Sequence, residues 1–193
     1  ILEFCSPFSF ILLTGLYGSG ALLIRELRVR WHKGWPSVLL LGAAYGILEE
    51  GLACKSFFSP NWGDLGILNV YGRWAGVNWV WAVGLTVFHS MFSIFAALLF
   101  VDLLFPKHKE EPWLGRGTSI CAALMLAAVT LFGFFVFPDT PSVLAVIGSL
   151  AAMALLTAIA RLIPNHKPHL EPGPHLPRPF WFGITGFLTS ITY

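Results

Sequence analysis

Three polar side chains in an otherwise apolar chain are suited to chemistry: the adjacent carboxylates of Glu49 and Glu50, and the imidazole of His89. Neighbouring carboxylates and an imidazole can share and relay protons. Such a set can activate a water molecule, carry protons or hold a cation. We therefore predict that Glu49, Glu50 and His89 form a catalytic or proton-handling centre inside the protein.

The same residues also have a purely structural explanation. Buried charges are normally paired, so the two glutamates could pair with Lys55 or Arg73. For His89 the corresponding explanation is a hydrogen bond to Thr86, to Ser93 or to a backbone carbonyl. Both explanations stay open at this point. The candidate binding, supporting or lid residues are Lys55, Arg73, Asp64, Thr86 and Ser93.

The helix around the glutamates must come close to the segment that carries the histidine. On a 3.6-residue period Gly42, Gly46 and Glu50 fall on one line, and small residues spaced by four let membrane helices approach closely. The later segment has a stripe of small and polar residues. This stripe consists of Ala82, Thr86, His89, Ser90, Ser93 and Ala97. We therefore expect Glu50 to face the stripe and Glu49 to face the aromatic loop of residues 56–76.

The composition requires a bilayer as solvent. Of the 193 residues 56% are hydrophobic and 11% are charged, and the mean hydropathy is +0.72. Water-soluble domains contain roughly a quarter charged residues, and long uncharged runs are typical of membrane spans. The expected partner is the lipid bilayer, with no nucleic acid.

The apolar runs predict an all-α fold, a polytopic transmembrane helical bundle that forms a single integral-membrane domain over residues 1–193. We expect five complete spans and a truncated sixth. The predicted spans are residues 7–24, 37–54, 77–104, 118–137, 142–163 and 180–193. Because the chain starts with Ile and the last run is shorter than the roughly 20 residues that cross a bilayer, we expect a fragment at both ends.

Two features of the loops bear on ligands and orientation. The proline-rich segment 164–179 contains His166, His169 and His175, but no HExxH spacing. We therefore predict no metal site, and the sequence indicates no cofactor.

Ten of the 12 Lys and Arg residues fall in the first, third and fifth loops. This bias places those loops in the cytoplasm of a multi-pass plasma-membrane protein, with the basic segment 25–33 against anionic headgroups.

The spacing of Glu49, Glu50 and His89 resembles the motif spacing of the CPBP (CAAX-processing-type) family of intramembrane glutamic proteases. That family has the motifs Glu-Glu-x-x-x-Arg and Phe-x-x-x-His. Glu49 and Glu50 match the acidic pair and His89 matches the histidine, whereas Cys54 stands at the arginine position and Leu85 at the phenylalanine position. The resemblance implies that a glutamate activates water and that His89 orients it or stabilises the oxyanion.

Three functions are consistent with this sequence. The first is an intramembrane, protease-like hydrolase with a Glu/Glu/His centre. The second is a proton- or ion-coupled transporter in which the same residues line a polar path. The third is a structural subunit of a membrane complex, which would have other membrane subunits as partners and needs only the glycine faces and aromatic residues.

The predicted orientation can be tested by cysteine labelling. A membrane-impermeant thiol reagent should modify a cysteine placed at Asp64 in intact cells and spare one placed at Glu110, because the second loop is predicted outside and the third inside. Labelling at position 110 with protection at position 64 would reverse the orientation.

Overall fold

The computed structural model describes residues 6–63 and 65–164 and is mostly helical (74%). The first long helix runs without interruption through α1, a π-helical segment η2 and α2, and two later helices contain π-helical segments in the same way. The elements are α1 (Pro7–Leu13), η2 (Thr14–Gly18), α2 (Ser19–Arg30), α3 (Trp35–Ile47), η3 (Leu48–Ala53), the 3₁₀ turn η4 (Gly66–Asn69), β1 (Arg73–Trp74), β2 (Val77–Asn78), α4 (Trp79–Phe88), η5 (His89–Ala96), α5 (Ala97–Leu104), the 3₁₀ turn η6 (Pro106–His108), α6 (Arg116–Val136) and α7 (Val143–Leu162).

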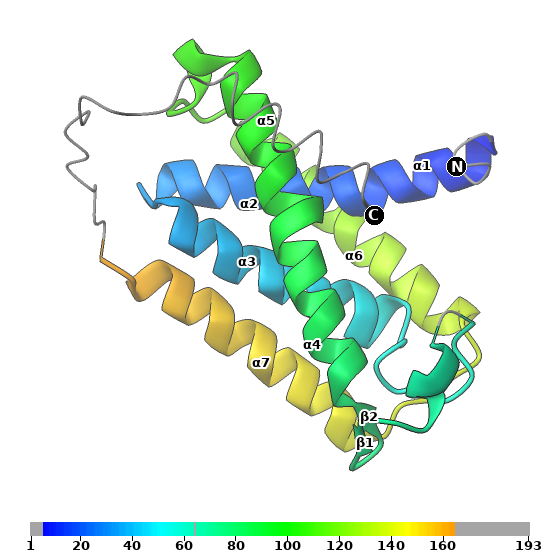
Figure 1. The fold of residues 1–193 in the computed structure, drawn as a ribbon. Coiled ribbons are helices and arrows are strands. Elements are labelled where there is room, and N and C mark those ends of the chain that lie inside the picture. Colours follow the sequence, from blue (N-terminus) through cyan, green and yellow to red (C-terminus); the bar gives the residue numbers. More distant parts are fainter. Residues whose placement is uncertain (1–5, 64, 165–193) are drawn as a thin grey trace, which may run out of the picture.

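The helix formed by α3 and η3 is the centre of the bundle. It lies between α2 and α7, and the helix of α4, η5 and α5 crosses it (Figure 1). Every residue from Glu49 to Ala53 is buried, whereas α6 buries Gly133 alone among its residues. The outer helices turn large apolar side chains outward. This arrangement suits lipid around the bundle and polar groups at its centre.

The prediction of five complete spans is not supported. Four helices are long and apolar enough to cross a membrane: Pro7–Arg30, Trp79–Leu104, Arg116–Val136 and Val143–Leu162. The predicted span 37–54 corresponds to the central helix, which is not among them because its two carboxylates and several small residues lower its mean hydropathy. The predicted sixth span, 180–193, lies outside the described residues.

Glycines bring the central helix against η5, as their spacing predicts. A Cβ atom on Gly42 would lie 2.9 Å from the Cα of Ser90, and one on Gly46 would lie 3.0 Å from the Cβ of His89. The expected close approach of this face to the polar stripe is therefore confirmed.

The loop between the central helix and α4 adds a small β hairpin to the helical fold. β1 and β2 pair antiparallel, with Arg73 opposite Asn78. The Asn78 side chain then caps α4 by accepting a hydrogen bond from the backbone N–H of Trp81 at 3.0 Å. Ser56, Phe57 and the other inner residues of the loop are buried, while Trp74 is 74% exposed. The loop thus covers one end of the bundle (Figure 1).

At the opposite end, arginines predicted to contact headgroups are buried instead. Arg25 donates to the carbonyl of His108 at 2.8 Å and stacks 3.6 Å from the ring centre of Trp113. Arg28 forms a 2.5 Å ion pair with Asp102. Because these partners come from α5 and the loop after it, the two arginines tie that loop to α2.

The close approach at Gly42 predicts a stability effect. Gly42→Ala should lower the free energy of unfolding by about 1–3 kcal/mol, because the methyl group would meet the backbone of η5. The measurement is reversible unfolding in mixed micelles. Gly84→Ala is the matched control, because no atom within 4 Å opposes a Cβ there. Equal effects of the two changes would contradict the packing.

Candidate functional site

Glu49, Glu50 and His89 come together at the centre of the bundle, and all three lie on π-helical segments. The glutamates belong to η3 and the histidine starts η5. In η3 the backbone N–H of Cys54 bonds to the carbonyl of Glu49, five residues earlier, at 2.7 Å. Such wide turns occur often at functional sites. The third π-helical segment, η2, contributes Tyr17 to the same place.

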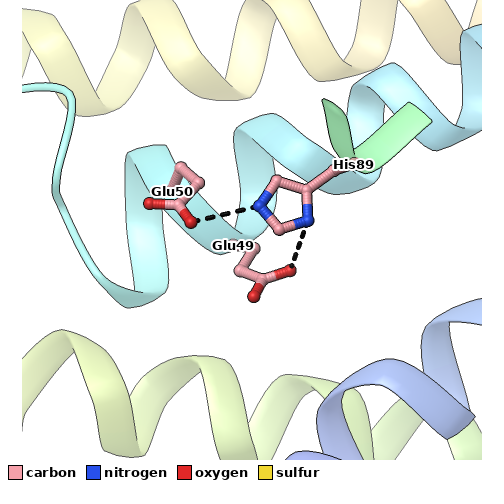
Figure 2. A group of neighbouring side chains, drawn as sticks. All are labelled: Glu49, Glu50 and His89. Carbon is pink, nitrogen blue, oxygen red and sulfur yellow. Dashed lines mark hydrogen bonds and ion pairs between the residues drawn. The ribbon is translucent and has the colours of Figure 1, made fainter. Parts of the chain in front are cut away.

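The imidazole of His89 lies between the two carboxylates (Figure 2). Its Nε2 atom is 3.1 Å from Oε1 of Glu50, and its Nδ1 atom is 3.3 Å from Oε2 of Glu49. His89 and Glu49 are each 3% exposed, and Glu50 is 8% exposed. The three groups therefore interact with little screening by water.

A hydroxyl group contacts each of these three side chains. Tyr17 donates to Oε1 of Glu49 at 2.5 Å, and Ser56 donates to Oε2 of Glu50. The hydroxyl of Ser93 is 3.0 Å from Nδ1 of His89. These contacts fix the orientation of both carboxylates and of the imidazole ring.

Two buried polar atoms at the centre have no hydrogen-bond partner among the described residues. They are Oε2 of Glu49 and the hydroxyl of Tyr45. Because Tyr45 and Glu49 are four residues apart on one helix, they share a face, and the Tyr45 ring also packs against His89, with 6.3 Å between ring centres. Buried polar groups are normally satisfied by protein or water, so these two atoms are suited to bind a further partner.

The structural explanation for the glutamates is not supported within residues 6–63 and 65–164. Lys55 is buried, but its ammonium group donates to the carbonyls of Phe134 and Phe137, each at 2.6 Å, at the end of α6. Arg73 donates to the carbonyls of Phe58 and Ser59 in the loop. Neither cation forms an ion pair with Glu49 or Glu50, so the two carboxylates share an imidazole as their nearest basic group.

Some of the positions predicted for the site residues are confirmed and others are not. Glu50 faces the polar stripe as predicted, but the expectation that Glu49 faces the loop is wrong, since it contacts Tyr17 and His89. Ser93 contacts His89, whereas Thr86 meets the central helix through its backbone beside Gly46. Asp64 lies outside the described residues.

Sequence reasoning missed the outer contacts of the site. Tyr17, Tyr45 and Ser56 all contribute hydroxyl groups, and Trp81 donates from its indole N–H to the hydroxyl of Ser56 at 3.1 Å. One signal was present, because Tyr45 stands four residues before Glu49. Nothing local to Tyr17 or Ser56 indicates their partners.

An apolar cavity of about 500 Å³ lies one helical turn from the centre. Ile47 and Thr86, which precede Glu50 and His89 by three residues, line it together with residues of α4, α7 and the loop. Residues three apart on a helix share a face. The cavity is therefore near the centre, although none of Glu49, Glu50 and His89 lines it.

The centre also has the donor set of a cation site. One ligand atom from each of Glu49, Glu50 and His89 can be chosen so that all three lie within 4.8 Å of one another. Carboxylate and imidazole are common ligands of divalent metal ions. The arrangement can thus bind a cation, pass protons across the imidazole or activate a water molecule.

Comparison with known proteins gives a family without an assigned activity. A family model described as an uncharacterized membrane protein family matches residues 1–192. No curated protein and no solved structure matches the chain.

Because Lys55 contacts the end of α6 and not the carboxylates, its contribution to the free energy of unfolding should be independent of theirs. Lys55→Met should lower the free energy of unfolding by about 1–3 kcal/mol, because the last carbonyls of α6 lose their donor. Since Lys55 shares no partner with Glu50, the double variant Lys55→Met/Glu50→Gln should be additive within about 0.5 kcal/mol in unfolding measurements. A coupling above about 1 kcal/mol would mean that the two side chains are paired.

Proposed function

The chain belongs to an uncharacterized membrane protein family, and we propose that it is an intramembrane hydrolase in which Glu49, Glu50 and His89 activate a water molecule. The observation that carries the proposal is the contact of one buried imidazole with two buried carboxylates, neither of which has a Lys or Arg partner among the described residues. Ionisable side chains inside a membrane lower the stability of the protein. Residues of this kind in membrane proteins usually mark a functional site.

The contacts assign a role to each group. A carboxylate accepts a proton from water as the water oxygen attacks a substrate carbonyl carbon. The C–N or C–O bond then breaks, and the leaving atom receives a proton through His89. The hydroxyl of Tyr45, which has no partner in the described part of the chain, is a donor for the oxyanion that forms in between.

The surroundings favour a substrate that comes from the bilayer. The cavity beside the centre is lined by α4 and α7, which belong to two helices that are long and apolar enough to cross a membrane. Apolar lining with a few convergent polar groups is typical of ligand sites. Together with the resemblance to the CPBP motifs, this supports a membrane-embedded peptide as the substrate, in a plasma-membrane protein whose first, third and fifth loops are cytoplasmic.

A second function is favoured by one specific observation. Each ring nitrogen of His89 faces a different carboxylate, which is the arrangement of a proton relay. In a proton-coupled transporter, Glu50→Gln or His89→Ala would abolish proton flux into liposomes without any hydrolysis. Flux and hydrolysis are separate measurements, so the two functions can be distinguished.

Hydrolysis can be detected while the substrate is still unidentified. Purified protein is incubated with membrane extract in H₂¹⁸O, and mass spectrometry searches for newly formed carboxylates that carry ¹⁸O. We expect labelled products with the wild type and a loss of at least about 100-fold with Glu50→Gln or His89→Ala, because general acid–base groups contribute roughly 10²–10⁴-fold.

Glu110→Gln is the matched control for this experiment, because Glu110 is an exposed glutamate of the loop after α5. It should retain full labelling. Labelled products that persist in Glu50→Gln and His89→Ala would assign the hydrolysis to a contaminant, and their absence from every sample, the wild type included, would overturn the proposed function.

A further inference from the structure

We propose that a second cavity, between the end of α2, the start of α3 and the end of α5, binds the headgroup of an anionic phospholipid. The cavity has a volume of about 290 Å³, and its lining includes Arg28, Trp35, Asp102, Leu103 and Lys109. It shares no lining residue with the cavity near the glutamates. The proposal is therefore independent of the proposed hydrolysis.

Arg28 supplies the first phosphate donor of the cavity. Its Nη1 atom donates to Asp102 at 2.5 Å, and its guanidinium lies 4.1 Å from the ring centre of Trp35. These two contacts fix the guanidinium, but they use only one of its three nitrogen atoms. The other two nitrogens have no hydrogen-bond partner in residues 6–63 and 65–164, and neither is fully enclosed in the way that Nε of Arg25 is. A fixed guanidinium with free N–H groups is suited to bind phosphate oxygens.

Lys109 supplies the second donor and decides the charge of the cavity. It follows η6, is exposed, and forms no ion pair or hydrogen bond with the described residues. The charged side chains that line the cavity are Arg28, Asp102 and Lys109. Because Asp102 compensates Arg28, the lining has a single net positive charge. A ligand with one uncompensated negative charge matches it.

The rest of the lining is apolar, so the ligand must be amphipathic. Leu99, Leu103 and Pro106 complete the cavity, and Leu103 is 70% exposed on the outer face of α5. The volume lies just below the roughly 300–1,000 Å³ of sites for drug-sized ligands. It accommodates a headgroup, while the acyl chains would lie outside the cavity against the exposed side chains of α5.

The cavity also lies at the depth where headgroups are found. Leu103 belongs to the last turn of the apolar helix Trp79–Leu104, and Trp35 is of the residue type that concentrates at membrane interfaces. Basic pockets between membrane helices on the cytoplasmic side bind anionic headgroups. In the proposed orientation the first and third loops, and with them this cavity, face the cytoplasmic leaflet.

The test compares two phospholipids with the same acyl chains. Phosphatidylglycerol is anionic and phosphatidylcholine is zwitterionic. Each is titrated into the purified full chain in detergent micelles, and native mass spectrometry measures the bound lipid. Since each Lys or Arg near anionic lipid contributes about a factor of five in affinity, we expect phosphatidylglycerol to bind about 5-fold more tightly than phosphatidylcholine.

Reversal of one charge tests whether the cavity is the binding site. Lys109→Glu changes the charge of the lining by two and should weaken phosphatidylglycerol binding about 20-fold, whereas Lys109→Arg should retain it. Lys107→Glu is the matched control, because Lys107 is exposed on η6 and does not line the cavity. It gives the chain the same net charge and should change the affinity less than about 2-fold.

Three outcomes would overturn the proposal. Equal weakening by the two reversals would assign binding to the general surface charge. Phosphatidylcholine bound as tightly as phosphatidylglycerol would show that the cavity does not select negative charge. Displacement of the lipid by millimolar inorganic phosphate would show that the apolar lining makes no contribution.

Thermal unfolding provides a second readout. A ligand that binds only the folded state stabilises it by mass action. Phosphatidylglycerol should therefore raise the unfolding temperature of the wild type and of Lys107→Glu by similar amounts, and that of Lys109→Glu by less. Rises of the same size in all three proteins would contradict binding at this cavity.

Discussion

The structure depends on the burial of two carboxylates in a bundle that otherwise presents apolar surface to its surroundings. Glu49 and Glu50 sit on the helix with the most complete burial, and four longer apolar helices lie around it. A charged group at the centre of a membrane helix costs roughly 3 kcal/mol even on lenient insertion scales. The bundle reduces this cost by surrounding the pair with hydroxyl groups and an imidazole, each delivered by a different segment.

Local helix geometry explains how adjacent residues serve one centre. On an ideal helix Glu49 and Glu50 would point about 100° apart. Ideal geometry therefore predicts that Glu49 faces the loop when Glu50 faces His89. In η3 the hydrogen bonds span five residues, so the side chains turn less per residue, and both carboxylates reach the same imidazole. The same type of turn occurs in η2 and η5, where Tyr17 and His89 lie.

The features that could be predicted from the sequence are those that depend on composition or on the spacing of residues within one helix. Apolar runs located the helices, and the Gly42 and Gly46 line gave the face that meets His89. The count of spans failed because the central helix has the length of a span without its apolarity. The hydroxyls of Tyr17 and Ser56 and the contacts of Lys55 and Arg25 could not be predicted, because they depend on packing between segments far apart in the chain. A buried Lys that caps another helix looks in sequence the same as a Lys that pairs with a carboxylate.

The central position of α3 and η3 has a consequence for biogenesis. Polar groups inside a bilayer need partners within the protein, and most of the elements that contact this helix follow it in the chain. The helix of α4, η5 and α5 provides His89 and the surface against Gly42 and Gly46, and α7 closes the other side. The full set of contacts around the centre can therefore form only after residues up to 162 have been synthesised.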